Sequence, residues 1–198
     1  MTNLELVFPE IFLSLSIMFL LILGVFKKNS SKLIQNISLI ILLVTSVIII
    51  NETLGVKQTL LFNGSIIIDY LSSFMKIVTL LAAFLVLVIS STYLKIFKIF
   101  KIEYPILILS SVLGMMVMIS SNDLIVFYMG LELQSLALYV LATFNRDQLK
   151  SSEAGLKYFV LSALSSGLLL YGCSLIYGFS GSTNFNLIAG QLNSDQYA

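Results

Sequence analysis

The apolar residues of this chain gather in long runs separated by short polar stretches. A helix that crosses a lipid bilayer needs about 20 mostly apolar residues. Six runs approach this length and predict six transmembrane helices, at residues 6–26, 33–50, 66–90, 105–120, 122–144 and 153–179. Residues 180–198 read as a polar tail. We therefore predict an all-α integral membrane protein with a single membrane domain over residues 1–198.

Polar residues at two of the predicted starts fit helix termini. Pro9 and Glu10 suit a first helical turn, because proline lacks only an unpartnered N–H there and a carboxylate favours the N-terminal dipole. Asn122 or Asp123 is expected to cap the fifth helix, after a turn too short to hold further structure.

The composition agrees with a membrane protein and excludes several kinds of site. Hydrophobic residues make up 58% and charged residues 11%, whereas soluble domains carry about 25% charged residues. The chain has no histidine and one cysteine, Cys173, which excludes an internal disulfide, the usual zinc and iron–sulfur sites and a histidine-ligated haem. No glycine-rich nucleotide loop is present, and a net charge of +1 gives no basic excess for nucleic acid. We expect no metal and no cofactor in this chain, and no nucleic-acid partner.

The basic residues predict an orientation. Eight of the eleven lie in the first, third and fifth loops: Lys27, Lys28, Lys32, Lys95, Lys98, Lys101, Arg146 and Lys150. The second loop has Lys57 alone. The positive-inside rule then places these basic loops in the cytoplasm or the mitochondrial matrix. Both termini are expected on the opposite, periplasmic or intermembrane-space side.

Glu132 is the clearest ionisable residue inside a predicted span. An acidic or basic side chain at a helix centre costs roughly 2.5–3.5 kcal/mol, so it needs a partner, water or a function. Tyr128, Glu132, Ser135 and Tyr139 are spaced by 4, 3 and 4 residues and share one narrow helix face. Such a stripe should face protein or a hydrated path. We interpret Glu132 as a proton-exchanging carboxyl; the alternative is a structural, hydrogen-bonded one.

Lysines in two other predicted spans are further candidates. Lys157 follows Glu153 by four residues, which suits a helical ion pair, although Lys157 could also turn inward toward Glu132. Asp69 and Lys76 lie seven residues apart on one face of the third predicted span. Asp69 is close to the helix end and is interpreted as a cap, whereas Lys76 is deeper and is interpreted as one half of a structural pair.

Several segments resemble chain 2 of the proton-pumping NADH:ubiquinone oxidoreductase (respiratory complex I), called subunit N in bacteria. LELQSLALYVL, which contains Glu132, and EAGLKYFVLSALSSGLLLYG, which contains Lys157, are specific to that family. PEIFLSLSIMFLLILGVF and IIIDYLSSFMKIVTLLAAF are similar to its first and third spans. The resemblance runs from about Leu6 to Phe185. Related sodium/proton antiporter subunits share the fold.

The resemblance implies a mechanism. In this family a glutamate of the fifth span and an adjacent lysine form a charge pair in a hydrated proton channel, and Glu132 and Lys157 match the two family positions. Redox energy released elsewhere in the complex is thought to shift such pairs in turn. NADH, FMN, the iron–sulfur clusters and ubiquinone would be bound by other subunits.

The length departs from the family. Full members have fourteen spans, built partly from two inverted five-helix repeats. Six spans would supply only part of a proton path, so we expect a second polypeptide, as from a split gene, to carry the remaining helices. Other membrane-arm subunits and membrane lipids are the further expected partners. The abundance of Ile, Lys and Asn without Trp favours a mitochondrial inner membrane, with a bacterial plasma membrane as the alternative.

Two other functions stay open. The chain could be a free-standing cation/proton antiporter subunit, which would need a complete path within one chain or a homo-oligomer. It could also be a structural membrane anchor, in which Glu132 only makes hydrogen bonds.

Overall fold

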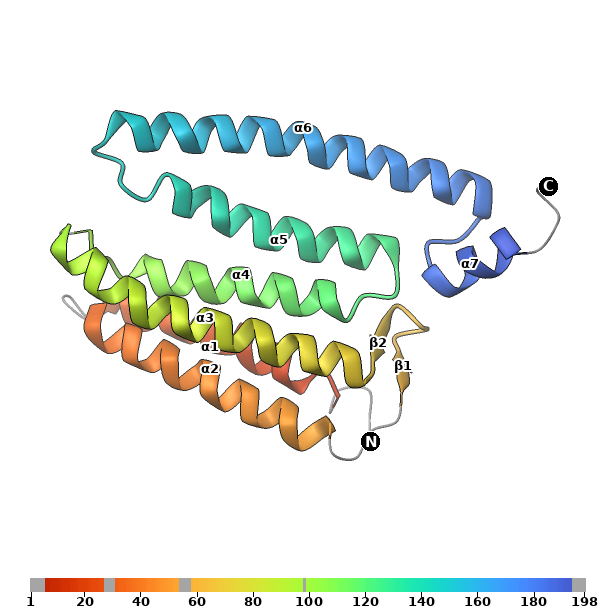
Figure 1. Cartoon of the computed structure of the whole chain (residues 1–198), viewed down its shortest axis with the longest axis horizontal. Helices are drawn as coiled ribbons and strands as arrows, with labels where there is room; N and C mark the ends of the chain where they lie inside the picture. Colours follow the sequence, from red (N-terminus) through yellow and green to blue (C-terminus); the bar gives the residue numbers. More distant parts are fainter. Residues whose placement is uncertain (1–5, 27–30, 54–57, 98, 194–198) are drawn as a thin grey trace.

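A computed structural model describes residues 6–26, 31–53, 58–97 and 99–193. In chain order the elements are α1 (Phe8–Phe26), α2 (Ser31–Thr53), β1 (Thr59–Leu61), β2 (Ile66–Ile68), α3 (Tyr70–Ile96), α4 (Glu103–Ile119), α5 (Leu124–Ala142), α6 (Leu149–Ser180) and α7 (Phe185–Asn193). Helices α1 to α6 lie alongside one another, while the strands and α7 lie together at one end (Figure 1). We call this the hairpin end and the opposite one the basic end.

The helices confirm a multi-pass membrane protein. Five of them, α1, α2, α3, α5 and α6, are long and apolar enough to cross a membrane. Helix α4 is apolar but has 17 residues, slightly fewer than a span usually needs. Within the described residues, the observed bounds of most helices agree with the predicted ones to within about four residues.

The third predicted span begins too early. Residues 66–90 were expected to be helical, but Ile66–Ile68 form β2, which pairs antiparallel with β1, and α3 runs from Tyr70 to Ile96. The apolar run therefore changes conformation at Asp69, whose side chain accepts a hydrogen bond from Ser72 N and starts the helix. Hydropathy does not distinguish a buried strand from the start of a helix.

The turn between the strands is built on left-handed backbone. Phe62, Asn63 and Gly64 have φ values of 50°, 56° and 86°. Asparagine and glycine adopt this region more easily than other residues, which is why Asn-Gly pairs favour hairpins. The polar tail also differs from its prediction, because α7 begins where Asn184 accepts a hydrogen bond from Asn186 N.

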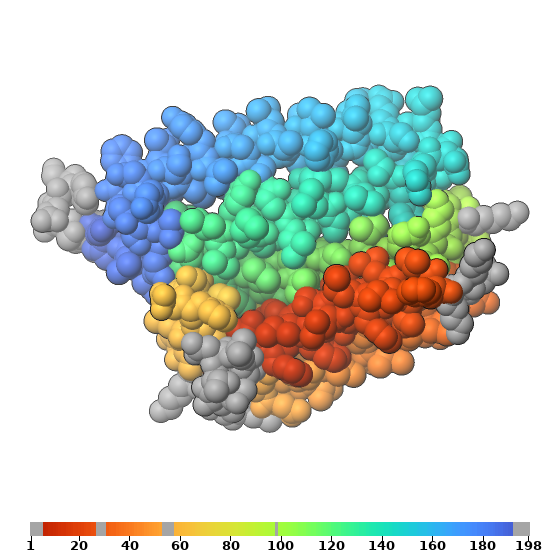
Figure 2. All heavy atoms as spheres, turned by 180° about the vertical axis from the view of Figure 1, so that it is seen from behind, coloured from red at the N-terminus to blue at the C-terminus, as the bar shows by residue number. Residues whose placement is uncertain are grey.

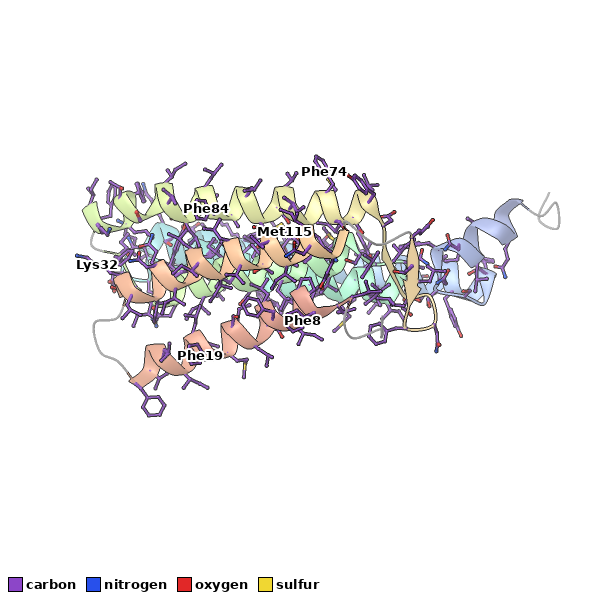
Figure 3. All side chains as sticks on the ribbon, turned by 90° about the horizontal axis from the view of Figure 1, so that it is seen from below. Phe8, Phe19, Lys32, Phe74, Phe84 and Met115 are labelled. Atoms are coloured by element: carbon purple, nitrogen blue, oxygen red, sulfur yellow. The ribbon has the colours of Figure 1, made fainter. Side chains whose placement is uncertain are left out.

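The core fills the space among α1 to α4. Leu13, Leu20, Leu42, Leu80 and Leu109 are each at most 1% exposed and belong to one hydrophobic cluster. Outward-facing residues are apolar as well: Phe19 and Phe74 point away from the bundle (Figure 3) and are 56% exposed. An apolar core under an apolar surface is the arrangement expected of helices surrounded by lipid.

Glycines bring α4 and α5 into close backbone contact. A Cβ atom added to Gly114 would lie 2.5 Å from Gln134 N, and one added to Gly130 would lie 2.8 Å from Met118 N. Small residues at a helix interface allow such an approach in membranes. The resulting contact fixes α5, and with it Glu132, against the four-helix core.

Helix α6 is attached along one side only. Gly155 is the sole buried residue of α6. Helix α6 forms one edge of the molecule, and α5 lies between it and the other helices (Figure 2). Gly155 lies under Thr143, Tyr158 stacks edge-on against Tyr139, and Ser166 bonds to Glu132. Along the interface the α5 positions run backwards, from Thr143 to Tyr139 to Glu132, while the facing α6 positions run forwards, from Gly155 to Tyr158 to Ser166. Helices α5 and α6 are therefore antiparallel with a constant register.

A set of hydrogen bonds joins three connections at the hairpin end. The Gly64 carbonyl oxygen accepts from the side-chain amides of Asn122 and Asn184, each at 2.8 Å. The Thr183 hydroxyl donates to the Asp123 carboxylate at 2.5 Å. Asp123 also caps α5, accepting from Ile125 N at 2.8 Å, as the sequence predicts. The hairpin, the start of α5 and the end of α6 are thereby held together.

Candidate functional site

Glu132 belongs to a short polar chain between α5 and α6. It lies eight residues after Leu124, the first residue of α5, and therefore about 12 Å along the helix. The Ser166 hydroxyl of α6 donates a hydrogen bond to Glu132 Oε1. The Ser166 and Tyr128 hydroxyl oxygens lie 2.9 Å apart and share a second hydrogen bond. Three half-buried side chains are thus connected near the middle of both helices.

Most of the predicted stripe on α5 faces α6. Tyr128 and Glu132 meet Ser166, and Tyr139 packs edge-on against Tyr158, with ring centroids 4.9 Å apart. Ser135 is half-buried and, within the described residues, makes no hydrogen bond to Glu132. The stripe therefore faces a neighbouring helix, and its hydrogen-bonded part is Tyr128 and Glu132.

Lys157 pairs with Glu153 and not with Glu132. Lys157 Nζ lies 2.6 Å from Glu153 Oε1, and the two side chains are 68% and 52% exposed. The register of α5 and α6 places Lys157 near residue 141, nine residues and about 13 Å along the axis from Glu132. Of the two alternatives, the structure has the i,i+4 ion pair. Within the described ranges, Glu132 has no lysine or arginine within 4.0 Å.

Lys76 forms a buried ion pair with Glu10, a partner that the sequence did not suggest. Lys76 Nζ lies 2.5 Å from Glu10 Oε1, and the side chains are 4% and 10% exposed. Asp69, which was grouped with Lys76 on one helix face, forms a capping box with Ser72. The capping interpretation of Asp69 is therefore confirmed, and Lys76 is paired with Glu10 of α1 and not with a residue of its own helix.

Basic residues mark the end of the bundle opposite the hairpin. Lys32 is exposed there (Figure 3), Lys95 Nζ lies 5.4 Å from the Phe100 ring centroid, and Lys101 Nζ lies 5.9 Å from that of Phe144. Arg146 and Lys150 of the fifth predicted loop are exposed. Four other lysines of the predicted loops, Lys27, Lys28, Lys57 and Lys98, fall outside the described residues.

Sequence reasoning missed three polar residues that the structure brings into the two clusters. Ser166 was not named as a site residue, although a hydroxyl in a span offers a donor to a buried acid. Glu10 was assigned to the helix dipole alone. Glu52, at the end of α2, lines a cavity beside Lys76 and was not singled out. Because Glu52 and Lys76 lie on different helices, the spacing between them in the sequence could not indicate that they are close.

Known proteins match the chain both in sequence and in fold. A family model described as NADH:quinone oxidoreductase/Mrp antiporter, TM, matches residues 121–197, which include α5 and α6. NADH-quinone oxidoreductase subunit N of Pelagibacter ubique is 70% identical over 197 residues, covering 100% of this chain and 42% of the relative. Subunit N of Maricaulis maris is 51% identical, covering 94% of this chain and 39% of the relative.

A solved structure shows the same fold. A chain of respiratory complex I from Thermus thermophilus with bound aureothin matches with a TM-score of 0.74 and 25% identity, covering 93% of this chain and 42% of that one. This places the protein in the class of antiporter-like membrane helix bundles. The chain is similar along nearly its whole length to subunit N of bacterial NADH-quinone oxidoreductases. It spans about two fifths of the length of the curated relatives it matches.

Proposed function

We propose that this chain is part of the membrane arm of a proton-pumping NADH:quinone oxidoreductase and that Glu132 is its proton-exchanging residue. The observation that carries the proposal is the Tyr128–Ser166–Glu132 chain, which puts a carboxylate and two hydroxyls in contact between two helices of membrane-spanning length. Hydroxyl groups both donate and accept, so they can pass a proton to or from a carboxylate. NADH oxidation and quinone reduction would belong to other subunits.

The cation for Glu132 would come from outside the described residues. A carboxylate in a low-dielectric region changes its proton affinity when a cation approaches or withdraws. Lys157 is engaged by Glu153 about 13 Å away along the helix, so we assign it to the rim of the path. The supporting residues nearest the carboxylate are Tyr128 and Ser166, with Ser135 and Tyr139 on the same helix face.

The remaining helices of subunit N would cover the exposed side of α6. This side carries Gly167, Gly172 and Gly178, and an added Cβ on any of them would meet nothing within 4 Å. Helix packing in membranes favours such small residues. The matched relatives are more than twice as long as this chain, which supports further helices, carried on a second polypeptide or on a longer form of this one. Together they would make the fourteen-helix fold.

The proposed orientation follows the basic residues. Six crossings by α1 to α6, with α4 counted despite its 17 residues, would bring the first and last described residues, Leu6 and Asn193, to the same side of the membrane as the hairpin end. The positive-inside rule then assigns the basic end to the cytoplasm and the hairpin end to the periplasm. The matched relatives are bacterial, which favours the plasma membrane of a bacterium over a mitochondrial inner membrane.

The deciding experiment replaces Glu132 with Gln in the assembled complex. Gln keeps the shape and cannot exchange a proton, so the number of protons pumped per NADH oxidised should fall, while assembly on a native gel is retained. Glu103→Gln, the same change at an exposed residue of α4, is the control and should leave the ratio unchanged. An unaltered ratio in Glu132→Gln would refute the role.

A second candidate, a free-standing antiporter, is favoured by the matching family model, whose description includes the Mrp antiporter. It predicts sodium/proton exchange by the purified chain in lipid vesicles, whereas a subunit of a larger machine should show none alone. The structural-anchor alternative predicts instead that Glu132→Gln is silent in both turnover and pumping.

A further inference from the structure

A second group of ionisable side chains lies in the four-helix core, away from Glu132. Lys76 of α3 is 3% exposed and Glu10 of α1 is 8% exposed, and their charged atoms lie 2.5 Å apart. Glu52, at the end of α2, interacts electrostatically with both of them. Three different helices thus contribute one charged side chain each to the same place.

The charges of this group do not balance. With all three side chains ionised, two carboxylates and one ammonium carry a formal charge of −1. One carboxylate oxygen, Glu10 Oε2, is buried and has no hydrogen-bond partner among the described residues. A net charge and an unpartnered carboxylate oxygen are both unfavourable in a low-dielectric interior. The net charge is removed when the group binds one proton.

A small cavity connects the group to the hairpin end. It is lined by Glu52, Lys76 and Ser73 together with Asp69 and Tyr70 at the start of α3, and its volume is about 20 Å³. This is room for about one water molecule, and the polar lining offers the partners that such a water needs. Lys76 lies six residues into α3, about 9 Å along the axis from the helix start, and the lining of the cavity extends from Lys76 to Asp69 and Tyr70 at that start.

No other charge among the described residues compensates the group. Asp69 is half-buried, adds a further negative charge and is engaged in the capping box with Ser72. Tyr70 is 80% exposed. Helix α4, which packs against α1 and α3, carries Glu103 and Tyr104 at the opposite end of the bundle.

We propose that Glu10, Glu52 and Lys76 form a second proton-binding site, which exchanges one proton with the hairpin end of the membrane. In the exchange, a proton from water forms an O–H bond with a carboxylate oxygen and the group changes from −1 to neutral. The site lies in the opposite half of the chain from Glu132, and its existence does not depend on the role proposed for Glu132.

Infrared difference spectroscopy during a pH titration of the assembled complex tests this site. A protonated carboxylic acid has a C=O stretch that a carboxylate lacks, so the wild type should show one such signal from this group. Glu10→Gln and Glu52→Gln each leave one carboxylate paired with Lys76 and no net charge, so either change should abolish the signal. Glu103→Gln is the matched control and should retain it, and Glu132→Gln should retain it as well.

Lys76→Met sharpens the test, because it leaves two carboxylates and no cation. The signal should then persist to higher pH than in the wild type. If a Gln variant does not assemble, Glu52→Asp keeps the carboxyl group and should keep the signal. A signal that survives in both Gln variants would overturn the proposal, as would one that responds to sodium at constant pH. Neither result would bear on proton pumping through Glu132.

Discussion

Ser166 of α6 donates its hydroxyl hydrogen to the Glu132 carboxylate of α5, and the same hydroxyl oxygen lies 2.9 Å from that of Tyr128. Among the described residues, Ser166 is the one side chain of another helix that forms a hydrogen bond with Glu132. Replacing Ser166 therefore tests the site independently of replacing Glu132.

Ser166→Ala should reduce proton pumping by the assembled complex. A hydrogen bond to a charged group contributes about 1.5–3 kcal/mol, so its loss changes the proton affinity of Glu132 and breaks the connection to Tyr128. Ser162→Ala, one turn earlier on α6, is the matched control and should be neutral. Pumping per NADH oxidised is the measurement, and equal values for both variants would argue against a relay through Ser166.

The buried pair of Lys76 and Glu10 should matter for stability. Removing one partner of a buried ion pair leaves an uncompensated charge and costs about 3–5 kcal/mol. Lys76→Met leaves Glu10 and Glu52 without a cation, so it should lower the thermal unfolding temperature in lipid nanodiscs. Lys157→Met breaks an exposed pair worth about 0–1 kcal/mol and is the control. Similar losses for Lys76→Met and Lys157→Met would contradict the burial of the former.

Asp69 should behave as a helix cap and not as a proton carrier. Asp69→Ala removes the bond to Ser72 N and should destabilise α3 by about 0.5–2 kcal/mol. Asp69→Ser also caps and should restore most of that stability without restoring a carboxylate. Thermal unfolding and proton pumping are measured together. A loss of pumping in Asp69→Ser at normal stability would show that the Asp69 carboxylate takes part in proton transfer.

The two kinds of glycine in the bundle should respond differently to a methyl group. In Gly130→Ala the new Cβ would lie 2.8 Å from Met118 N and 3.0 Å from Gly114 O, so α4 and α5 must separate and the unfolding temperature should fall. Gly167→Ala meets nothing within 4 Å and should be neutral or slightly stabilising in the isolated chain, since alanine favours helix over glycine by about 1 kcal/mol.

A larger residue at the same position tests the covering of α6. Gly167→Phe should leave the isolated chain folded and prevent its association with the remaining helices of subunit N, measured by co-purification. Exposed Leu161→Phe on the same helix is a size-matched comparison. Normal co-purification of Gly167→Phe would mean that this side of α6 faces lipid.

Much of the fold could be predicted from the sequence because a bilayer imposes its thickness on helices. Apolar run length alone located most of the helices. Asp123 was one of two caps predicted for the fifth run, and the structure selects it over Asn122. The hairpin was missed because Ile66–Ile68 is as apolar as the helix that follows it. The signal that could have found it is Asn63-Gly64 between two apolar stretches.

The ionisable residues show where sequence reasoning ends. The helical period placed Tyr128 and Glu132 on one face of α5, and it paired Glu153 with Lys157, because both relationships lie within one helix. It could not pair Lys76 with Glu10, which is 66 residues away on another helix. Tertiary packing, and not spacing, decided that Lys76 points into the four-helix core while Asp69 turns back to its own backbone.

The carbonyl oxygen of Gly64 links the movement of three helices. It holds one amide from the segment that begins α5 and another from the segment that follows α6, and it sits five residues before the cap of α3. Sliding or tilting of the outermost helix therefore strains the strand turn, and that strain reaches the helix on which Lys76 stands. A displacement of α6 on one side of the molecule would therefore shift the position of Lys76, which is buried on the other side.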